Sequence, residues 1–257
     1  MVAFSGGVDS TVLAKLARDA LGKEGVVAVT ADSASLARED LQEIVRLANE
    51  LDVDLVVIRT GEVENPLYQA NTSSRCFFCK QELFEHLQRM ATARGIATIL
   101  YGAIGDDARE DRPGSRAAQA YGVRAPLQEL GVSKTEVRAI AKRLGLSNWD
   151  RPQNACLSSR IPHGQDVTAE KLRSIERAEA FLRQRGFRQV RVRHLGHYAR
   201  IEVGTEDLHR FDDDTLCQQV ARYFQQLGFE AVKLDRAGYR AGGANQATVE
   251  EQLLSDK

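Results

Sequence analysis

Hydrophobic positions in the first hundred residues form short apolar runs that are separated by amphipathic segments. The runs have the length of strands and lie at residues 1–4, 26–30, 54–59 and 98–101. The segments between them have apolar residues three and four positions apart and lie at residues 11–21, 38–51 and 80–93. This spacing is typical of helices. Alternating strands and helices predict an α/β fold, a doubly wound parallel sheet with helices on both faces.

The pattern changes in the last third of the chain, where a smaller set of elements follows. We expect helices at 169–184 and 213–227, and strands at 189–193, 198–203 and 231–235. Polar stretches at 105–126 and 149–164 indicate long loops, a helix at 133–144 starts at Ser133, and the tail after Ala244 has the pattern of a frayed helix. The chain therefore divides into a larger domain, residues 1–164, and a small C-terminal α/β domain, residues 165–257.

A glycine turn joins the first predicted strand to the first predicted helix, with the sequence Ser5-Gly6-Gly7-Val8-Asp9-Ser10. Such a turn directs backbone N–H groups and a helix N-terminus at one point, which suits an anion. The serines add hydroxyl donors, and Asp9 could hold Mg²⁺ on bound phosphates. The alternative is an ordinary Gly/Ser turn before a helix.

Three further residues follow predicted strands and are expected around the same pocket. They are Asp32, Ser33 and Gly102. Ligands of parallel sheets bind at the carboxyl ends of the strands, where these residues lie.

Charge and hydropathy narrow the choice of partners. The chain of 257 residues has 35 basic and 36 acidic residues and a formal net charge of −1. This balance gives no overall attraction for nucleic acid or membranes. Because there is neither a long apolar run nor a signal peptide ahead of Ser5, we expect a cytoplasmic protein that acts on a small molecule.

The cysteines provide the second candidate site. Cys76 and Cys79 form a C-x-x-C pair at the start of a predicted helix, and Cys156 lies in a polar loop. In a reducing compartment such a pair is more often metal-binding or redox-active than a disulfide. Three thiolates could hold an iron–sulfur cubane with one iron open, since a structural zinc site usually has four protein ligands. Alternatively, Cys76 and Cys79 are small buried residues and only Cys156 reacts, whereas Cys217, within a helix, is structural.

The hexapeptide resembles the PP-loop of ATP pyrophosphatases, and motifs along nearly the whole chain resemble the LarE family of sulfur transferases. The matching stretches are residues 5–10, 65–68, 75–80, 112–114, 155–162 and 237–240. The resemblance implies binding of ATP and Mg²⁺ by Ser5 to Ser10. It also implies that a carboxylate of pyridinium-3,5-biscarboxylic acid mononucleotide is adenylated and converted to a thiocarboxylate, in nickel-pincer nucleotide biosynthesis.

The sulfur source differs between two types within that family. One type has a single cysteine at the position of Cys156, which gives up its own sulfur. The other type has three cysteines that bind a [4Fe-4S] cluster. Cys76, Cys79 and Cys156 match the second type, and the sequence leaves the choice between the two sources open.

The resemblance also assigns substrate-binding residues and an assembly. Arg191 and Arg193 match the family's phosphate-binding arginines, Glu202 matches a substrate-site glutamate, and Arg240 is a further candidate. Strand alternation places the first three on one sheet face. The alternative is a solvated face with an Arg–Glu pair. Relatives form homohexamers and have a longer segment ahead of the PP-loop than Met1 to Phe4.

Other functions remain as alternatives. A PP-loop tRNA thiolase would also combine ATP with cysteines, although it would need a more basic surface. A non-catalytic sensor would bind an adenine nucleotide beside a redox-active C-x-x-C pair. An amidating ligase is disfavoured, because no glutaminase segment is present.

Overall fold

The computed structural model describes residues 1–257 apart from 110–112, 153–154, 241–242, 246–250 and 255–257, and it divides into two compact units. The first unit consists of Met1–Tyr68 and Ser73–Asn154, and the second of Gln69–Thr72 and Ala155–Lys257. The division at Ala155 precedes the boundary that we expected at Gly164. The segment around Cys156 therefore belongs to the second unit.

The first unit is built on a four-stranded parallel sheet of order β3-β2-β1-β4. Its strands are β1 (Val2–Ala3), β2 (Val27–Asp32), β3 (Asp54–Arg59) and β4 (Leu100–Tyr101). Its helices of four or more residues among the described residues are α1 (Val8–Leu21), α2 (Arg38–Glu50), α3 (Pro66–Gln69, which ends in the second unit), α4 (Arg75–Arg94), α5 (Pro113–Ala120), α6 (Pro126–Glu129) and α7 (Lys134–Arg143). Although β1 has two residues, it lies between β2 and β4, and Val2 pairs with both.

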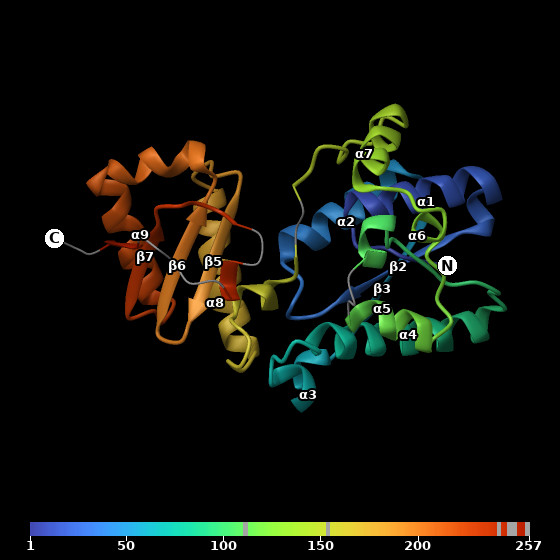
Figure 1. Ribbon diagram of the computed structural model, residues 1–257, viewed down its shortest axis with the longest axis horizontal. Helices are drawn as coiled ribbons and strands as arrows, with labels where there is room; N and C mark the ends of the chain where they lie inside the picture. Colours follow the sequence, from blue (N-terminus) through green and yellow to red (C-terminus); the bar gives the residue numbers. More distant parts are fainter. Residues whose placement is uncertain (110–112, 153–154, 241–242, 246–250, 255–257) are drawn as a thin grey trace. The chain divides into compact units, whose positions relative to one another are not determined.

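Helices cover both faces of this sheet, as Figure 1 shows, with α1 and α2 on one side and α4 and α5 on the other. Alternation along β2 explains the two layers. Ala28 packs with α1 and α2, whereas its neighbours Val27 and Val29 pack with α4 and α5. Successive side chains of a strand point to opposite faces, so a run of apolar residues supplies two cores. The expected doubly wound fold is confirmed.

One expected loop of the first unit contains helices. Residues 105–126 hold the short helix α5, and α6 starts at Pro126, while 110–112 lie outside the described residues. Ala117 and Ala118 of α5 are buried in the core beside α4. The prediction was wrong because α5 has two turns and a small apolar side, and tertiary packing stabilises such short helices.

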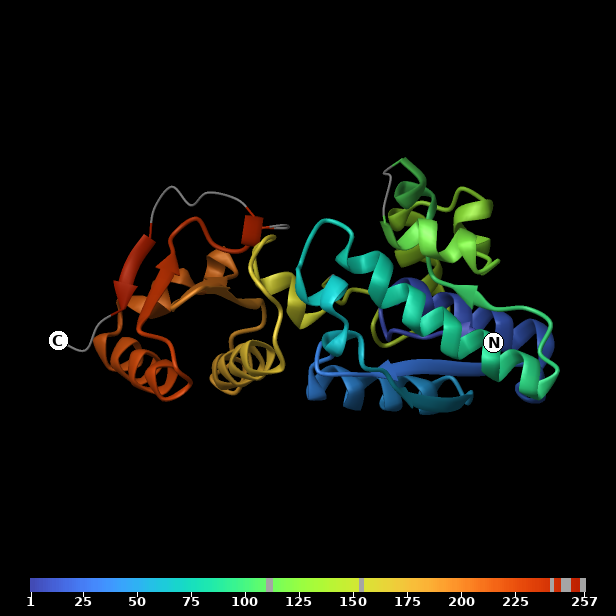
Figure 2. The ribbon, with the colours of Figure 1, turned by 90° about the horizontal axis from the view of Figure 1, so that it is seen from below.

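The second unit is built on a mixed sheet of order β5-β6-β7-β8. Its strands are β5 (Val190–Leu195), β6 (Tyr198–Val203), β7 (Ala231–Asp235) and β8 (Glu251–Leu254). Helices α8 (Ala169–Arg183) and α9 (Asp214–Gln226) lie along one face, as the turned view in Figure 2 shows. Two 3₁₀ segments are used below, η4 (Leu157–Arg160) and η5 (Thr205–Asp212).

The tail differs from the frayed helix that we expected after Ala244. Residues 251–254 form β8, which pairs antiparallel with β7, while 246–250 lie outside the described residues. Leu254 is buried in the core, and Lys233 donates to Glu251 across the pair at 2.8 Å. Cross-strand pairing therefore decides the conformation of this polar segment. Among the described residues, no helix has the length and apolar character to span a membrane.

Candidate functional site

The glycine turn of the first unit lies directly between β1 and α1. Phe4 still bonds to β2 through its N–H, Gly7 is the N-cap residue, and α1 begins at Val8. Gly6 has φ +69°, and a Cβ there would lie 2.7 Å from Cγ1 of Ile44. Only glycine fits this backbone, because both the conformation and the space exclude a side chain.

Hydroxyl groups of the turn and of the first helical residues bond within the loop. Ser5 Oγ and Ser10 Oγ lie 3.1 Å apart, and the carbonyl oxygen of Gly7 accepts from Ser10 Oγ at 3.0 Å and from Thr11 Oγ1 at 2.9 Å. No side chain among the described residues caps the N-terminus of α1. The first N–H groups of α1, from Val8 to Ser10, thus have no partner inside the helix and can bind an anion.

Lys134 lies against this loop, and the sequence reasoning missed it. Its Nζ donates to both carboxylate oxygens of Asp9, at 2.7 and 2.9 Å. Lys134 is the first residue of α7, directly after Ser133, which forms a capping box with Glu136. That box is visible in the sequence, but the approach of α7 to α1 is a tertiary feature. A lysine that is distant in sequence, at the start of α7, therefore lies at the loop.

The predicted residues at the carboxyl ends of β2 and β4 take two different roles. Asp32 pairs with Arg38 at 2.6 Å, and Ser33 donates to Glu62, a buried carboxylate that the sequence reasoning did not identify. Gly102 allows close packing, because a Cβ there would lie 2.8 Å from the backbone nitrogen of Ser10. Gly102 therefore supports the start of α1.

The cysteines, all of which lie among the described residues, form no disulfide. Cys76 and Cys79 are the second and fifth residues of α4 in the first unit, and Cys156 precedes η4 in the second unit. Cys76 and Cys156 are exposed. Within the described residues, no group of three or more His, Cys, Asp or Glu side chains is assembled for a metal ion. The donor set of three thiols nevertheless suits an iron–sulfur cluster. Cys217 is buried and donates to Phe211 O at 3.1 Å, which fits a structural residue.

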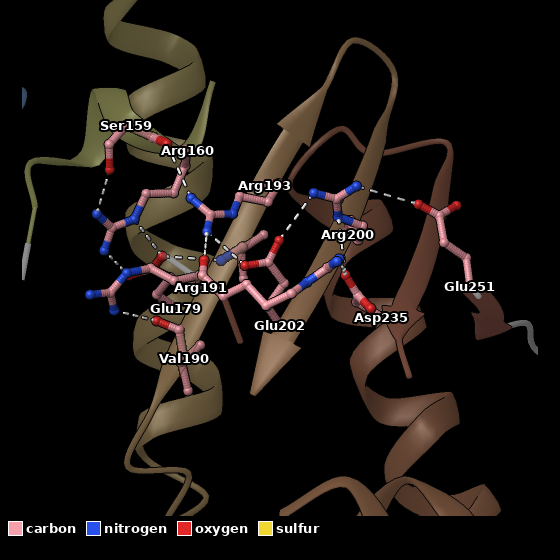
Figure 3. Close-up of polar contacts among 12 residues, drawn as sticks. Ser159, Arg160, Glu179, Val190, Arg191, Arg193, Arg200, Glu202, Asp235 and Glu251 are labelled. Carbon is pink, nitrogen blue, oxygen red and sulfur yellow. Dashed lines mark hydrogen bonds and ion pairs between the residues drawn. The ribbon is translucent and has the colours of Figure 1, made fainter. Parts of the chain in front are cut away.

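Three of the predicted substrate residues, Arg191, Arg193 and Glu202, come together on one face of the second sheet, as Figure 3 shows. Arg191 pairs with Glu202 in the register of β5 and β6. Arg193 Nη2 donates to Glu202 at 2.6 Å and to the carbonyl oxygen of Arg240 at 3.3 Å. Arg240 donates in turn to Asp235 at 2.8 Å. This face is buried, so the alternative of a solvated Arg–Glu pair does not hold.

Positive charge exceeds negative charge among the buried groups of the second unit. In the described part of the second unit, four arginines and three acidic residues are buried: Arg160, Arg191, Arg193 and Arg200 against Glu179, Glu202 and Asp235. Nε of Arg193 and Nε of Arg240 have no hydrogen-bond partner among the described residues. Burial, followed by the nearby charge of Arg160, lowers the pKa of Arg191 to about 10. An anion at this face would offset that cost.

Arg160 and Glu179 form a second feature that the sequence reasoning missed. Both side chains are buried, and Arg160 lies in the 3₁₀ segment that directly follows Cys156. Burial would raise the pKa of Glu179, but the charge of Arg160 and its hydrogen bonds outweigh this, and the pKa lies below its usual value. The motif around Cys156 contains this arginine, whereas its acidic partner comes from α8, which no local pattern indicates.

Comparison with known proteins relates the chain to several enzymes. The family described as NAD synthase matches residues 1–102. The chain is 36% identical to the pyridinium-3,5-bisthiocarboxylic acid mononucleotide synthase of Lactiplantibacillus plantarum, over 99% of this chain and 91% of that protein. It is 45% identical to an uncharacterized protein of Synechocystis, over 96% of this chain and 91% of that protein. The chain is 28% identical to the GMP synthase of Aeropyrum pernix, over 72% of this chain and 39% of that enzyme. The first two of these relatives match across both units.

Proposed function

The chain belongs to the LarE family of pyridinium-3,5-bisthiocarboxylic acid mononucleotide synthases, and from this we infer that it is an ATP-dependent sulfur transferase. It adenylates a carboxylate of pyridinium-3,5-biscarboxylic acid mononucleotide and converts it to a thiocarboxylate, a step of nickel-pincer nucleotide biosynthesis. The observation that carries this conclusion is the 36% identity over 99% of the chain, which includes both the PP-loop and the Cys156 segment.

We propose that the first half-reaction takes place at the PP-loop. A carboxylate oxygen of the substrate forms a bond to the α-phosphorus of ATP, the bond to the bridging oxygen breaks, and pyrophosphate leaves. The backbone N–H groups of Val8 to Ser10 and the Lys134 ammonium bind the departing phosphates, which lowers the barrier because negative charge gathers there. Asp9 would hold Mg²⁺, and the ion would neutralise further phosphate charge. The two glycines of the loop and the uncapped N-terminus of α1 support the assignment of the phosphate site to the PP-loop.

The second half-reaction uses a sulfur nucleophile, and we assign it to Cys156. The sulfur forms a bond to the acyl carbon, the bond from that carbon to the adenylate oxygen breaks, and AMP leaves. On the sacrificial route this sulfur is Sγ of Cys156, and the thiocarboxylate is released when the Cβ–Sγ bond breaks by elimination and leaves dehydroalanine at this position. Cys156 is exposed and its backbone is fixed by Arg160. In the form of the proposal that we favour, Cys76, Cys79 and Cys156 would instead hold a [4Fe-4S] cluster. A replaceable sulfide supplied by the cluster would then be the nucleophile, and Cys156 would keep its own sulfur as a ligand.

The buried Arg191 and Arg193 and the partly exposed Arg240 bind the phosphate of the nucleotide substrate in this proposal. Arg191, Arg193 and Arg240 supply the donors, and Glu202 fixes Arg193 through a 2.6 Å ion pair. The excess of buried positive charge supports an anionic ligand. The homohexamer implied by the resemblance is part of the same proposal, and light scattering after size-exclusion chromatography measures it.

A labelled-ATP experiment tests the function. Protein incubated with [α-³²P]ATP and the biscarboxylate substrate should release AMP and pyrophosphate only when both are present, and form a thiocarboxylate product. The Cys156→Ala variant should still release pyrophosphate but form no thiocarboxylate, because the two half-reactions use different groups. Binding of ATP without pyrophosphate release would instead indicate a nucleotide sensor and contradict the proposal.

A second experiment distinguishes the two sulfur sources. Anaerobically prepared protein should be brown and contain iron and acid-labile sulfide, and the Cys76→Ser and Cys79→Ser variants should lose both. Protein that remains free of iron after anaerobic reconstitution, and in which Cys156 loses the mass of hydrogen sulfide during turnover, would establish the sacrificial route.

A further inference from the structure

Asn148 contacts the PP-loop from a position far along the chain. It follows α7, and its side chain is 2% exposed. Its Nδ2 donates to the carbonyl oxygen of Gly6 at 3.1 Å and to Thr11 Oγ1 at 3.0 Å. The carbonyl oxygen can only accept, so the amide nitrogen must face the loop.

Thr11 extends this contact to the second glycine. Its Oγ1 accepts from Asn148 and donates to the carbonyl oxygen of Gly7 at 2.9 Å. Asn148 therefore fixes the carbonyl of Gly6 directly. Through one hydroxyl it adds to the bonds that the Gly7 carbonyl also accepts from the Thr11 N–H and from Ser10 Oγ, each at 3.0 Å. No charged group takes part in this arrangement.

The direction of a carbonyl group also fixes the next N–H group. In a trans peptide the C=O and N–H bonds point in opposite directions, and the chain has no cis peptide among its described residues. Holding the carbonyls of Gly6 and Gly7 inward thus turns the N–H groups of Gly7 and Val8 away from Asn148. Glycine peptides rotate easily, so the peptide between Gly6 and Gly7 depends most on this restraint. Without it, the Gly7 N–H, whose other contact among the described residues is a 3.4 Å bond to Ser5 Oγ, would point in several directions.

The amide oxygen of Asn148, Oδ1, indicates that this residue does more than stabilise the fold. Asn148 Oδ1 is buried and has no hydrogen-bond partner among the described residues. A buried acceptor without a partner costs free energy, which an apolar side chain at this position would avoid. The asparagine is explained by its two donated bonds.

We propose that Asn148 is a positioning residue that orients the PP-loop N–H groups toward the phosphates of ATP. This inference rests on the proposed function in one respect, that ATP binds at the loop. The restraint exists before ATP arrives, so binding does not have to order the glycines.

The neighbouring residue provides a matched control. Ser147 tethers the same segment, but to α2: its Oγ donates to Glu50 at 2.6 Å and accepts from Arg46 at 2.8 Å. Ser147→Ala removes a tether of this segment without touching the PP-loop, whereas Asn148→Ala removes the tether to the loop.

The test is a titration of each variant with the non-hydrolysable analogue α,β-methylene-ATP, together with thermal unfolding. Asn148→Ala should weaken analogue binding about tenfold, the value of one or two lost hydrogen bonds. Asn148→Asp should weaken it further, since a carboxylate would face the Gly6 carbonyl. Ser147→Ala should bind as the wild type does, even if its unfolding temperature falls. Equal analogue affinity of Asn148→Ala and wild type, or an equal loss in Ser147→Ala, would overturn the inference.

A second pair of variants covers the case in which Asn148→Ala does not fold. Thr11→Val removes the hydroxyl that connects Asn148 to Gly7 and keeps the shape, and Thr11→Ser keeps the hydroxyl. Weak binding by the valine variant with recovery in the serine variant supports the inference, and equal binding by both contradicts it. A wild-type protein that binds no analogue would refute the proposed function instead.

Discussion

The carboxylate of Glu179 holds the guanidinium group of Arg160 by two hydrogen bonds, from Nε at 2.9 Å and from Nη2 at 3.1 Å. The third nitrogen of Arg160, Nη1, donates to the carbonyl oxygen of Cys156 at 3.0 Å. A bidentate pair has a fixed geometry. The backbone that presents the Cys156 thiol is therefore tied to α8 within the second unit.

We expect Arg160→Lys to reduce sulfur transfer at least about tenfold, because a lysine ammonium cannot bond to both carboxylate oxygens and to the Cys156 carbonyl in the same fork geometry. Adenylation should continue, since it takes place in the first unit. Separate assays of pyrophosphate and thiocarboxylate measure the two effects. Arg183→Lys is the control, because Arg183 also bonds to Glu179 but is 25% exposed. An equal loss of both half-reactions in Arg160→Lys would contradict this role.

Arg191→Met should weaken binding of the nucleotide substrate by about tenfold or more and leave ATP binding nearly unchanged. Its pKa of about 10 means that the folded protein disfavours the charged guanidinium at neutral pH. The destabilisation by the buried charge is present in full at neutral pH and decreases only as the pH rises above about 10. It is absent when the charge is removed by substitution. The variant should therefore unfold at a higher temperature than wild type when no substrate is present. Arg193→Ala should also lose substrate affinity, and equal losses of ATP and substrate affinity in either variant would refute the assignment.

Lys134→Met should slow pyrophosphate release by about a hundredfold, because it removes a cation from the developing phosphate charge and leaves Asp9 without its partner. Lys134→Arg keeps the charge and should recover part of the rate. Steady-state pyrophosphate release at saturating ATP is the measurement. A methionine variant with the wild-type maximal rate would place Lys134 outside the adenylation site.

His194→Gln should make the stability of the protein less dependent on pH in mildly acidic solution. Burial, followed by the charge of Lys171, lowers the pKa of His194 from 6.5 to about 4. The unfolded chain thus takes up a proton between these values and the folded protein does not, so stability is complete above pH 6.5 and falls as the pH drops through this range. Unfolding temperatures from pH 7 to 4 should decline more steeply for wild type than for the variant. Parallel curves would contradict the prediction.

Much of this fold could be predicted because local patterns and tertiary structure agree. The period of two in β5 and β6 correctly places Arg191, Arg193 and Glu202 on one face. The strand, glycine turn and helix around Gly6 also form as expected. In each case a short stretch of sequence contains all the information that the geometry needs.

The features that the sequence reasoning missed depend on contacts between distant residues. Lys134 reaches Asp9 across 125 positions, and Asn148 reaches Gly6 across 142. The strand β8 forms because β7 offers an edge, and α5 forms because α4 offers an apolar surface. No local period indicates such partners.

The short segment Gln69–Thr72 has a consequence for any attempt to divide the gene. It precedes most of the first unit's helices in sequence, yet it belongs to the second unit. There the buried side chain of Asn71 donates to the carbonyl oxygens of Ile161, Pro162 and Gln165. A fragment that starts at Ala155 would leave those three acceptors without this donor. After a protease nick near that point, the N-terminal fragment would still be bonded to the second unit through Asn71. The second unit therefore needs a segment that lies within the sequence of the first unit, so the two units cannot be separated by a single cut of the chain.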